Sequence, residues 1–252
     1  IYGPTPADEM VSAAERLRRD GEVTPRRETW RLLLAAYGEG LQGHLQEARE
    51  LFSRSRRLAE AVSGFEMRTG ALAYSGSLEL IAGDAKAAER DLRAAYELNE
   101  RAGLVSFAST LAASLALALY AQRRYAEAEN FADVSRNTSA ADDIASEAPW
   151  RRVLAKILAR RGEGVKALEL AREAVAMMEP TDAVNDRGDT LVDLAEVLEL
   201  IGRPDEAIEP LELARTLFEQ KQNIVSAGNV RARLADLAAQ RSACDPVEHS
   251  DP

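Results

Sequence analysis

Three basic residues on one predicted helix have the type and spacing most suggestive of chemistry in this sequence. The row consists of Arg152, Lys156 and Arg160. Residues four apart share a helix face, so these cations form one stripe that can bind a partner's carboxylates, a C-terminal carboxylate or a phosphate. The alternative is pairing with an acidic stripe on a neighbouring helix, where surface pairs contribute about 0–1 kcal/mol each. That acidic stripe consists of Asp189, Glu196 and Glu199.

The sequence lacks the usual patterns of catalytic and metal-binding sites. It contains no G-x-x-x-x-G-K-[ST] phosphate loop. The two histidines, His44 and His249, have no metal-ligand spacing with Cys244, the single cysteine. The pair Asp142 and Asp143 is typical of a helix start rather than of a catalytic dyad. We therefore predict no catalytic residues, no metal and no cofactor.

Composition narrows the classes of partner. The chain has 252 residues and a formal net charge of −10, which argues against nucleic acid and against anionic membranes as partners. One cysteine permits no intrachain disulfide and fits a reducing compartment. No signal-peptide pattern is present, and the first residue is Ile1, so we predict a cytoplasmic protein and a fragment of a longer chain.

One uncharged segment, residues 102–122, is long enough to cross a bilayer. It is rich in Ala, Ser and Thr, which makes its hydrophobicity modest on insertion scales. It also falls in register with the first helix of a repeat. We therefore interpret it as a helix buried on all sides in the middle of a helical stack.

A repeat of about 40 residues organises the whole chain. The turn positions, which lie 40, 40, 39 and 40 residues apart, are Gly43, Gly83, Arg123, Gly162 and Gly202. An alanine follows each turn by five residues, at Ala48, Ala88, Ala128, Ala167 and Ala207. Further small residues recur at Ser55, Ala95, Ser135, Ala174 and Ala214, and before the turns at Ala36, Gly76, Ala116, Ala155 and Ala195. Small residues at fixed positions let paired helices approach closely.

Each repeat is predicted to be a hairpin of two helices, A and B. The expected A helices are 27–41, 65–82, 104–122, 144–160 and 186–201, and the expected B helices are 45–63, 85–101, 125–136, 165–178 and one starting at Pro204. Pro210 should bend this last helix. A helix at 6–19 precedes the array, a capping helix at 224–240 follows it, and 241–252 is expected to be a disordered tail.

The small-residue positions and the turn resemble the tetratricopeptide repeat, whose usual unit has about 34 residues. The longer unit and the missing consensus proline at the end of helix B depart from that family. The resemblance implies one all-α domain over residues 1–240, a right-handed superhelix of five hairpins. The repeats would span 27–64, 65–103, 104–143, 144–183 and 184–223.

Two segments, 82–103 and 191–223, resemble repeats in the C-terminal regions of large bacterial signalling ATPases of the AAA or STAND type. Some of those proteins, found in actinobacteria, carry nucleotide cyclase domains and others carry LuxR-type DNA-binding domains. The resemblance implies a non-catalytic sensor domain of a larger regulator, in contact with that protein's other domains. A free-standing scaffold or adaptor, a self-association module that forms a homo-oligomer, and an enzyme are the alternatives.

In tetratricopeptide superhelices the A helices line a concave groove that binds proteins or peptides. Carried over by register, the predicted groove residues are Trp30, Tyr37, Tyr120, Arg152, Lys156, Arg160, Glu196 and Glu199. Leu33, Thr110, Leu117 and Asp189 occupy further groove positions. Trp30 and Tyr37 can equally pack against the first helix. The identity of the partner and the role of the basic stripe both stay open at this point.

Overall fold

The computed structural model describes every residue except 2, 20–23, 62–63, 104–106 and 245–252, and all regular structure in that part of the chain is helical. The first helices are α1 (Ala7–Arg19), α2 (Pro25–Leu41), α3 (Leu45–Ala61), α4 (Phe65–Ile81), α5 (Ala85–Arg101), α6 (Ala108–Ala121) and α7 (Tyr125–Thr138). They are followed by α8 (Ile144–Arg160), α9 (Gly164–Met178), α10 (Val184–Leu200), the 3-10 helix η2 (Pro204–Ala207), α11 (Ile208–Lys221) and α12 (Ile224–Cys244). The predicted all-α solenoid is confirmed.

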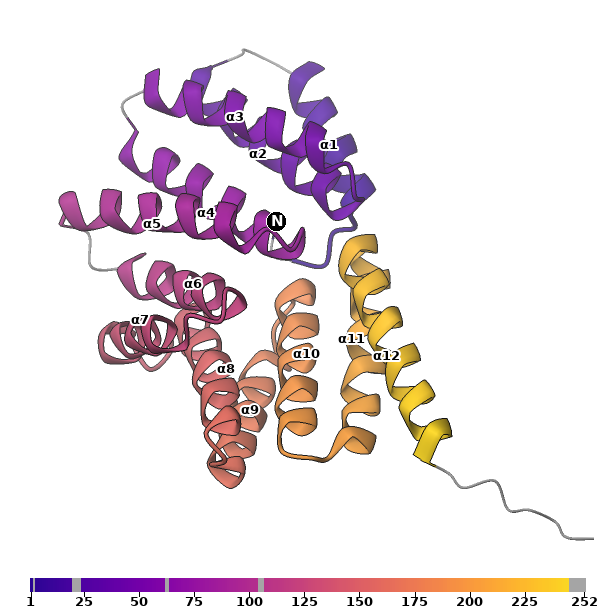
Figure 1. Cartoon of the computed structure of the whole chain (residues 1–252). Coiled ribbons are helices and arrows are strands. Elements are labelled where there is room, and N and C mark those ends of the chain that lie inside the picture. Colours follow the sequence, from indigo (N-terminus) through magenta and orange to yellow (C-terminus); the bar gives the residue numbers. More distant parts are fainter. Residues whose placement is uncertain (2, 20–23, 62–63, 104–106, 245–252) are drawn as a thin grey trace, which may run out of the picture.

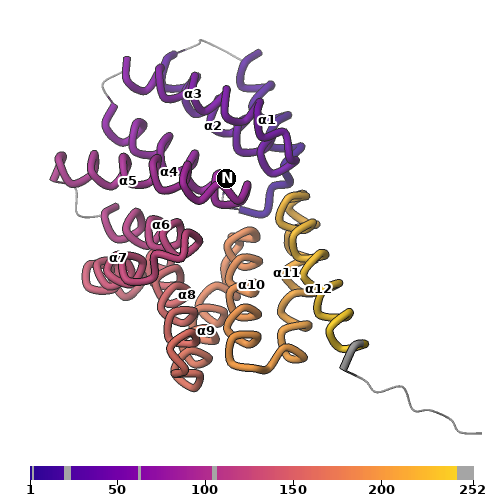
Figure 2. The backbone as a smooth tube through the Cα atoms, in the orientation of Figure 1, coloured from indigo at the N-terminus to yellow at the C-terminus, as the bar shows by residue number. Residues whose placement is uncertain are grey.

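Five hairpins stack in sequence order, and the stack curves strongly. The hairpins are α2–α3, α4–α5, α6–α7, α8–α9 and α10–α11 (Figure 1). The curvature brings the last helix, α12, back to the first hairpin, where it contacts α2 (Figure 2). The array therefore surrounds a central space, and its two ends meet.

The five A–B turns share one backbone conformation. Each turn residue has a positive φ, as at Gly43 (84°) and Gly202 (77°), and the residue after it donates its N–H to the carbonyl five residues earlier, as Arg203 does to Leu198. This is the Schellman ending of a helix, which favours glycine because a Cβ is strained at positive φ. In the third turn Arg123 adopts the same conformation with φ 61°. The hairpin geometry thus holds even where the glycine is replaced.

The recurring small residues form the contacts between helices. The fourteen alanine and serine positions that recur across the five repeats are all fully buried, and Gly76 is also buried. A Cβ built on Gly76 would lie 2.6 Å from Leu92 Cγ on the partner helix, so a larger residue would push α4 and α5 apart. The predicted close approach of the paired helices is confirmed.

A buried lysine holds the two ends of the array together. Lys221, the last residue of α11, is fully buried, and its Nζ donates hydrogen bonds to the carbonyls of Ile1, Gly3 and Thr5. The backbone N–H of Asp8 donates to Gln222 Oε1 (3.0 Å) beside it. These bonds attach the segment before α1 to the far end of the chain.

The structure differs most from the predicted elements at three places, and the other helix ends agree within two residues where they are described. The fifth B helix begins as η2 and becomes α-helical only at Ile208, because Pro210 has no N–H to donate to Glu206, so the α pattern starts late and no interior bend is needed. The α6 helix begins at Ala108, and residues 104–106 lie outside the described part. The α12 helix continues to Cys244, so residues 241–244 of the predicted tail are helical, and 245–252 are not described.

Within the described part of the chain, no helix combines the length and hydropathy needed to span a membrane. The uncharged segment contributes α6, whose leucines and alanines are buried between neighbouring helices, as at Leu115 and Leu119. This agrees with the interpretation of the segment as a central helix of the stack.

Candidate functional site

The central space is a cavity of about 620 Å³. The A helices of all five repeats contribute to its lining, together with the ends of α9 and α11 and one face of α12. This arrangement follows from the hairpins, because each A helix lies on the inner side of the curved stack. The cavity has two chemically different walls.

The apolar wall consists of residues from α2, α4 and α6. Its members are Tyr37, Tyr74, Leu80, Ile81 and Leu117. The rings of Tyr37 and Tyr74 pack edge to face with centroids 6.2 Å apart. Edge-to-face aromatic packing leaves rigid apolar surface, which is suited to contacts with apolar side chains. No residue of this wall carries a charge.

The charged wall consists of residues from α8 and α10. Arg152 Nε and Lys156 Nζ both lie 2.7 Å from the carboxylate of Asp193, one from each oxygen. All three side chains are buried. Burial alone would raise the pKa of Asp193, but Lys156 and Arg152 outweigh it and hold that pKa below its usual value. The two cations are therefore already bound to an anion of the same chain.

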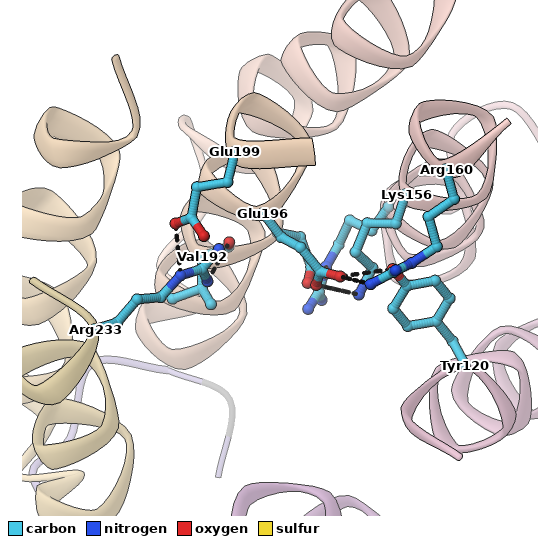
Figure 3. Close-up of polar contacts among 9 residues, drawn as sticks. Tyr120, Lys156, Arg160, Val192, Glu196, Glu199 and Arg233 are labelled. Carbon is cyan, nitrogen blue, oxygen red and sulfur yellow. Dashed lines mark hydrogen bonds and ion pairs between the residues drawn. The ribbon is translucent and has the colours of Figure 1, made fainter. Parts of the chain in front are cut away.

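Above this cluster, a second set of contacts joins three helices (Figure 3). Tyr120 of α6 donates its hydroxyl proton to Glu196 Oε1 of α10 at 2.6 Å, and Arg160 of α8 donates to the Tyr120 oxygen at 2.7 Å. Arg160 Nη2 also lies 3.0 Å from Glu196 Oε1. Burial first, and Glu196 second, raise the pKa of Tyr120, so the hydroxyl stays protonated. Tyr120 is where the two walls meet.

Two further carboxylates line the charged wall. Among the described residues, no group donates a hydrogen bond to the side chain of Asp186 or Asp189, and neither forms an ion pair. Burial raises the pKa of Asp186, and it raises the pKa of Asp189 to about 7, although Arg152 acts against both shifts. These carboxylates differ from Asp193 because the nearest cations are turned toward Asp193.

The structure divides the eight predicted groove residues into two groups. Those that line the cavity are Tyr37, Tyr120, Arg152, Lys156 and Glu196. Trp30, Arg160 and Glu199 lie outside its lining. Trp30 is 42% exposed, while Glu199 accepts a hydrogen bond from Arg233 of α12 at 2.8 Å (Figure 3). Of the further positions, Thr110, Leu117 and Asp189 line the cavity, and Leu33 is buried in the core.

The basic stripe lies opposite acidic residues of α10, as one of the two sequence interpretations proposed, but with different partners. Asp193 and Glu196 bind the three cations, whereas Glu199 binds α12 and Asp189 has no hydrogen bond in the described part. Asp193 was missed because the family register placed it outside the groove. Its 41-residue separation from Arg152, close to the repeat interval, is the signal that could have found it.

Residues that could share a metal ion occur at the turn between α2 and α3. Glu39, His44 and Glu47 are the only such group among the described residues, with ligand atoms within 4.8 Å of one another. His44 Nδ1 lies 2.6 Å from Glu39 Oε2, so a hydrogen bond already accounts for that pair, and His44 is well exposed. We assign no metal site to this group.

The hairpins, their turns and the central cavity define a helical repeat protein of the α-solenoid class. A family model described as "Tetratricopeptide repeat" matches residues 146–220, which cover the last two hairpins. The other three hairpins share the same turns and buried small residues, so the whole array resembles tetratricopeptide repeats. No curated protein matches the sequence significantly.

Solved structures of similar fold support this class. BtubC (BKLC) from P. vanneervenii has a TM-score of 0.59 and 16% identity, covering 98% of this chain and 97% of that chain. NprR in complex with its cognate peptide NprX has a TM-score of 0.60 and 16% identity, covering 94% and 65%. A Rap protein complexed with competence and sporulation factor has a TM-score of 0.57 and 12% identity, covering 94% and 72%. Similarity at this identity shows a shared fold.

Proposed function

We propose that this chain is a non-catalytic recognition module that binds a peptide, or an extended segment of a protein, in the central cavity. The observation that carries the proposal is the cavity itself, because every A helix of the array contributes to it. Its volume of about 620 Å³ lies within the range of about 300–1,000 Å³ usual for ligand pockets. One apolar wall and one charged wall offer both contact area and orientation.

Two similar folds support a peptide rather than a flat protein surface as the ligand. NprR and the Rap protein were each solved as a complex with a named peptide or factor. Here the ends of the array meet through Lys221, so the cavity is surrounded by helices. An extended segment fits such a space better than a folded domain does.

We also propose that the module belongs to a larger cytoplasmic regulator and passes its bound state to other domains. This part is supported only by the resemblance of segments 82–103 and 191–223 to bacterial signalling ATPases. In a sensor role, binding of a ligand in the cavity would change the activity of those other domains. A scaffold role or self-association would leave the cavity unused.

Affinity selection tests cavity binding directly. The purified chain is incubated with pools of seven-residue peptides, and retained peptides are identified by mass spectrometry. Ser114 lies half-buried on the cavity lining, so Ser114→Trp places an indole in the space. Ala126→Trp adds the same ring on an exposed position of α7 as a matched control.

Peptides retained by the parent chain and by Ala126→Trp, but lost from Ser114→Trp, would support the proposal. Equal retention by all three chains would contradict it, because the ligand would then lie outside the cavity. Sedimentation at several protein concentrations would show whether the array instead associates with itself. Circular dichroism must show that both tryptophan variants keep the helical fold.

A further inference from the structure

We propose that the ligand presents a basic group, a guanidinium or an ammonium, to Asp186 and Asp189 on the charged wall of the cavity. This inference rests on the proposed function, and it adds the sign of the charge that the ligand carries. It reverses the simplest interpretation of the basic stripe, which is that it binds an acidic partner. The argument depends on which charges of the wall already have partners.

The cations of the wall are occupied. Arg152 and Lys156 share the two oxygens of Asp193 at 2.7 Å each, in a buried cluster. Arg160 is bound to Glu196 and to the Tyr120 hydroxyl. An incoming carboxylate would have to share cations that already hold a buried anion in good geometry. A contact that weakened the pairing with Asp193 would leave buried charge uncompensated, so an acidic ligand gains little here.

The carboxylates of the wall are not all occupied. Asp186 and Asp189 line the cavity, yet no described residue donates a hydrogen bond to either. They lie three residues apart on α10, so they share one helix face. Both residues are partly shielded from water, and a shielded carboxylate without a donor is costly unless a cation or a donor joins it. A cationic group of the ligand would supply the missing hydrogen-bond donor and the positive charge.

The charged groups of the neighbouring helices do not fill this role. Arg152 and Lys156 of α8 influence Asp189 through space, but their hydrogen bonds go to Asp193. Lys221 of α11 influences Asp186, but its Nζ is bonded to three backbone carbonyls. The wall therefore keeps an excess of negative charge at the position of the two free carboxylates.

The protonation of Asp189 couples this site to pH. Burial, with Asp186 and Asp193 adding to it and Arg152 and Lys156 opposing it, raises the pKa of Asp189 to about 7. Below that pH the side chain is largely neutral and attracts a cation weakly. Above it the carboxylate is ionised, so binding of a basic group should tighten as the pH rises from 6 to 8. A ligand cation should in turn favour release of the Asp189 proton.

The apolar wall restricts the rest of the ligand. Tyr37, Tyr74 and Leu117 face the same cavity from the other side, and none is charged. A ligand that fills the space must then combine a basic residue with an apolar or aromatic one. We infer a short peptide segment of mixed character rather than a polycation, whose further charges would find no partners here.

Three peptide pools test the sign of the charge. Each pool holds seven-residue peptides with blocked ends and mixed Leu, Tyr, Ser and Ala at all positions except the centre. The centre is Arg or Lys in the first pool, Gln in the second and Glu in the third. The parent chain should retain the first pool about tenfold or more over the second, as expected for charge-assisted hydrogen bonds.

Two double variants test whether Asp186 and Asp189 bind the basic group. D186N/D189N keeps the shape of both side chains and should lose the preference for the basic pool, together with its rise from pH 6 to pH 8. The control D142N/D205N makes the same change in charge at exposed positions outside the cavity lining and should keep both. Ser114→Trp should abolish retention of every pool.

The possible outcomes separate the two proposals. Retention that Ser114→Trp abolishes, but that is equal for all three pools or highest for Glu, would overturn the basic-ligand inference and leave cavity binding intact. Retention that survives Ser114→Trp, or no retention of any pool, would overturn the proposed function and this inference with it. A basic preference that D186N/D189N keeps would place the cation elsewhere and overturn the assignment to these two residues.

Discussion

The two walls of the cavity have the same backbone but opposite chemistry. The α2–α4–α6 wall presents tyrosine and aliphatic side chains, with Tyr37 and Tyr74 in edge-to-face contact. The α8–α10 wall presents a buried cluster of cations and carboxylates around Asp193. Behind both walls lie the same fully buried small residues and the same turns. The repeat fixes the helix positions, and the inner face of each A helix is free to carry any chemistry.

The comparison also separates what stabilises the array from what it can bind. Apolar burial stabilises the first wall directly, at about 25 cal/mol per Å². The charged wall gains little net stability from its ion pairs, because removing charges from water costs nearly as much as their attraction returns. Its arrangement of charge is therefore better explained by specificity for a ligand or for one packing of α8 against α10.

The largest expected effect comes from breaking the charged wall at its centre. Asp193→Ala leaves Arg152 and Lys156 buried without an anion, so the free energy of unfolding should fall by about 3–5 kcal/mol. Urea denaturation followed by circular dichroism measures this change. Replacing all three residues, as R152M/K156M/D193L, should recover most of the loss, because no buried charge is left uncompensated.

The exposed pair of Arg203 and Glu206 provides the matched control for that experiment. Arg203→Ala removes a contact of similar length at the surface and should leave stability unchanged within error. A loss of less than about 1 kcal/mol for Asp193→Ala would show that water reaches the cluster. The description of the Asp193 cluster as shielded from water would then be wrong.

A smaller loss is expected where the ends of the array meet, since this contact keeps the two walls facing each other. Lys221→Met retains the apolar volume but removes the three bonds from Nζ to the carbonyls before α1. Hydrogen bonds from a charged group contribute about 1.5–3 kcal/mol, so we expect a loss of about 2 kcal/mol. Hydrogen exchange should show faster exchange of the Asp8 amide, which is bonded to Gln222.

Lys166→Met is the control for the lysine substitution, because among the described residues Lys166 pairs with Glu163 alone, at an exposed position. It should change neither stability nor exchange at Asp8. If Lys221→Met leaves the Asp8 amide protected, the closure depends on other contacts, and the cavity stays surrounded without this lysine.

The pH dependence of stability distinguishes the charged wall from the apolar wall. Asp189 has a pKa of about 7 in the folded chain against 3.8 for the ordinary side chain, so the folded state holds a proton that the unfolded state releases. Stability should therefore decrease as the pH rises from about 4 to 7 and then level off. Asp189→Asn removes this pH-dependent loss, so the variant should be more stable than the parent chain at pH 8, by at most about 4 kcal/mol.

At pH 4 the two chains should differ by less than about 1 kcal/mol, because the folded aspartate is protonated and the unfolded one, with an ordinary pKa of 3.8, still is in part. Urea denaturation of both chains at pH 4, 6 and 8 measures the difference. An advantage of Asp189→Asn that is the same at all three values would mean that the substitution acts through packing. A disadvantage at pH 8 would mean that the carboxylate is stabilised, and that its wall carries no excess of negative charge.

The sequence predicts the hairpin array well because residues close together in the sequence determine its turns and helices. Gly43, Gly83, Gly162 and Gly202 mark four turns at positive φ, and the interval alone identifies the remaining turn at Arg123. The site is harder to predict, because ion-pair partners depend on how far one helix slides along another. Register alone offered Glu199 as a partner for the basic stripe, whereas packing places Asp193 there and turns Glu199 toward α12. Lys221 had no local signal, since its partners lie more than 200 residues away.

The smallest effect is expected at the hydroxyl that joins the two walls. Tyr120 belongs to the buried core of the middle repeats, and its oxygen is bonded to both Glu196 and Arg160 (Figure 3). Tyr120→Phe keeps the ring and removes these two bonds, but Arg160 and Glu196 remain paired at 3.0 Å. The free energy of unfolding should therefore fall by only about 1 kcal/mol. Tyr125→Phe is the control, because its ring packs against Tyr120 with centroids 5.3 Å apart and its hydroxyl has no hydrogen bond among the described residues. A loss above about 3 kcal/mol at Tyr120 would mean that the bonds at this junction act cooperatively, so that the charged wall and the apolar wall form one unit rather than two.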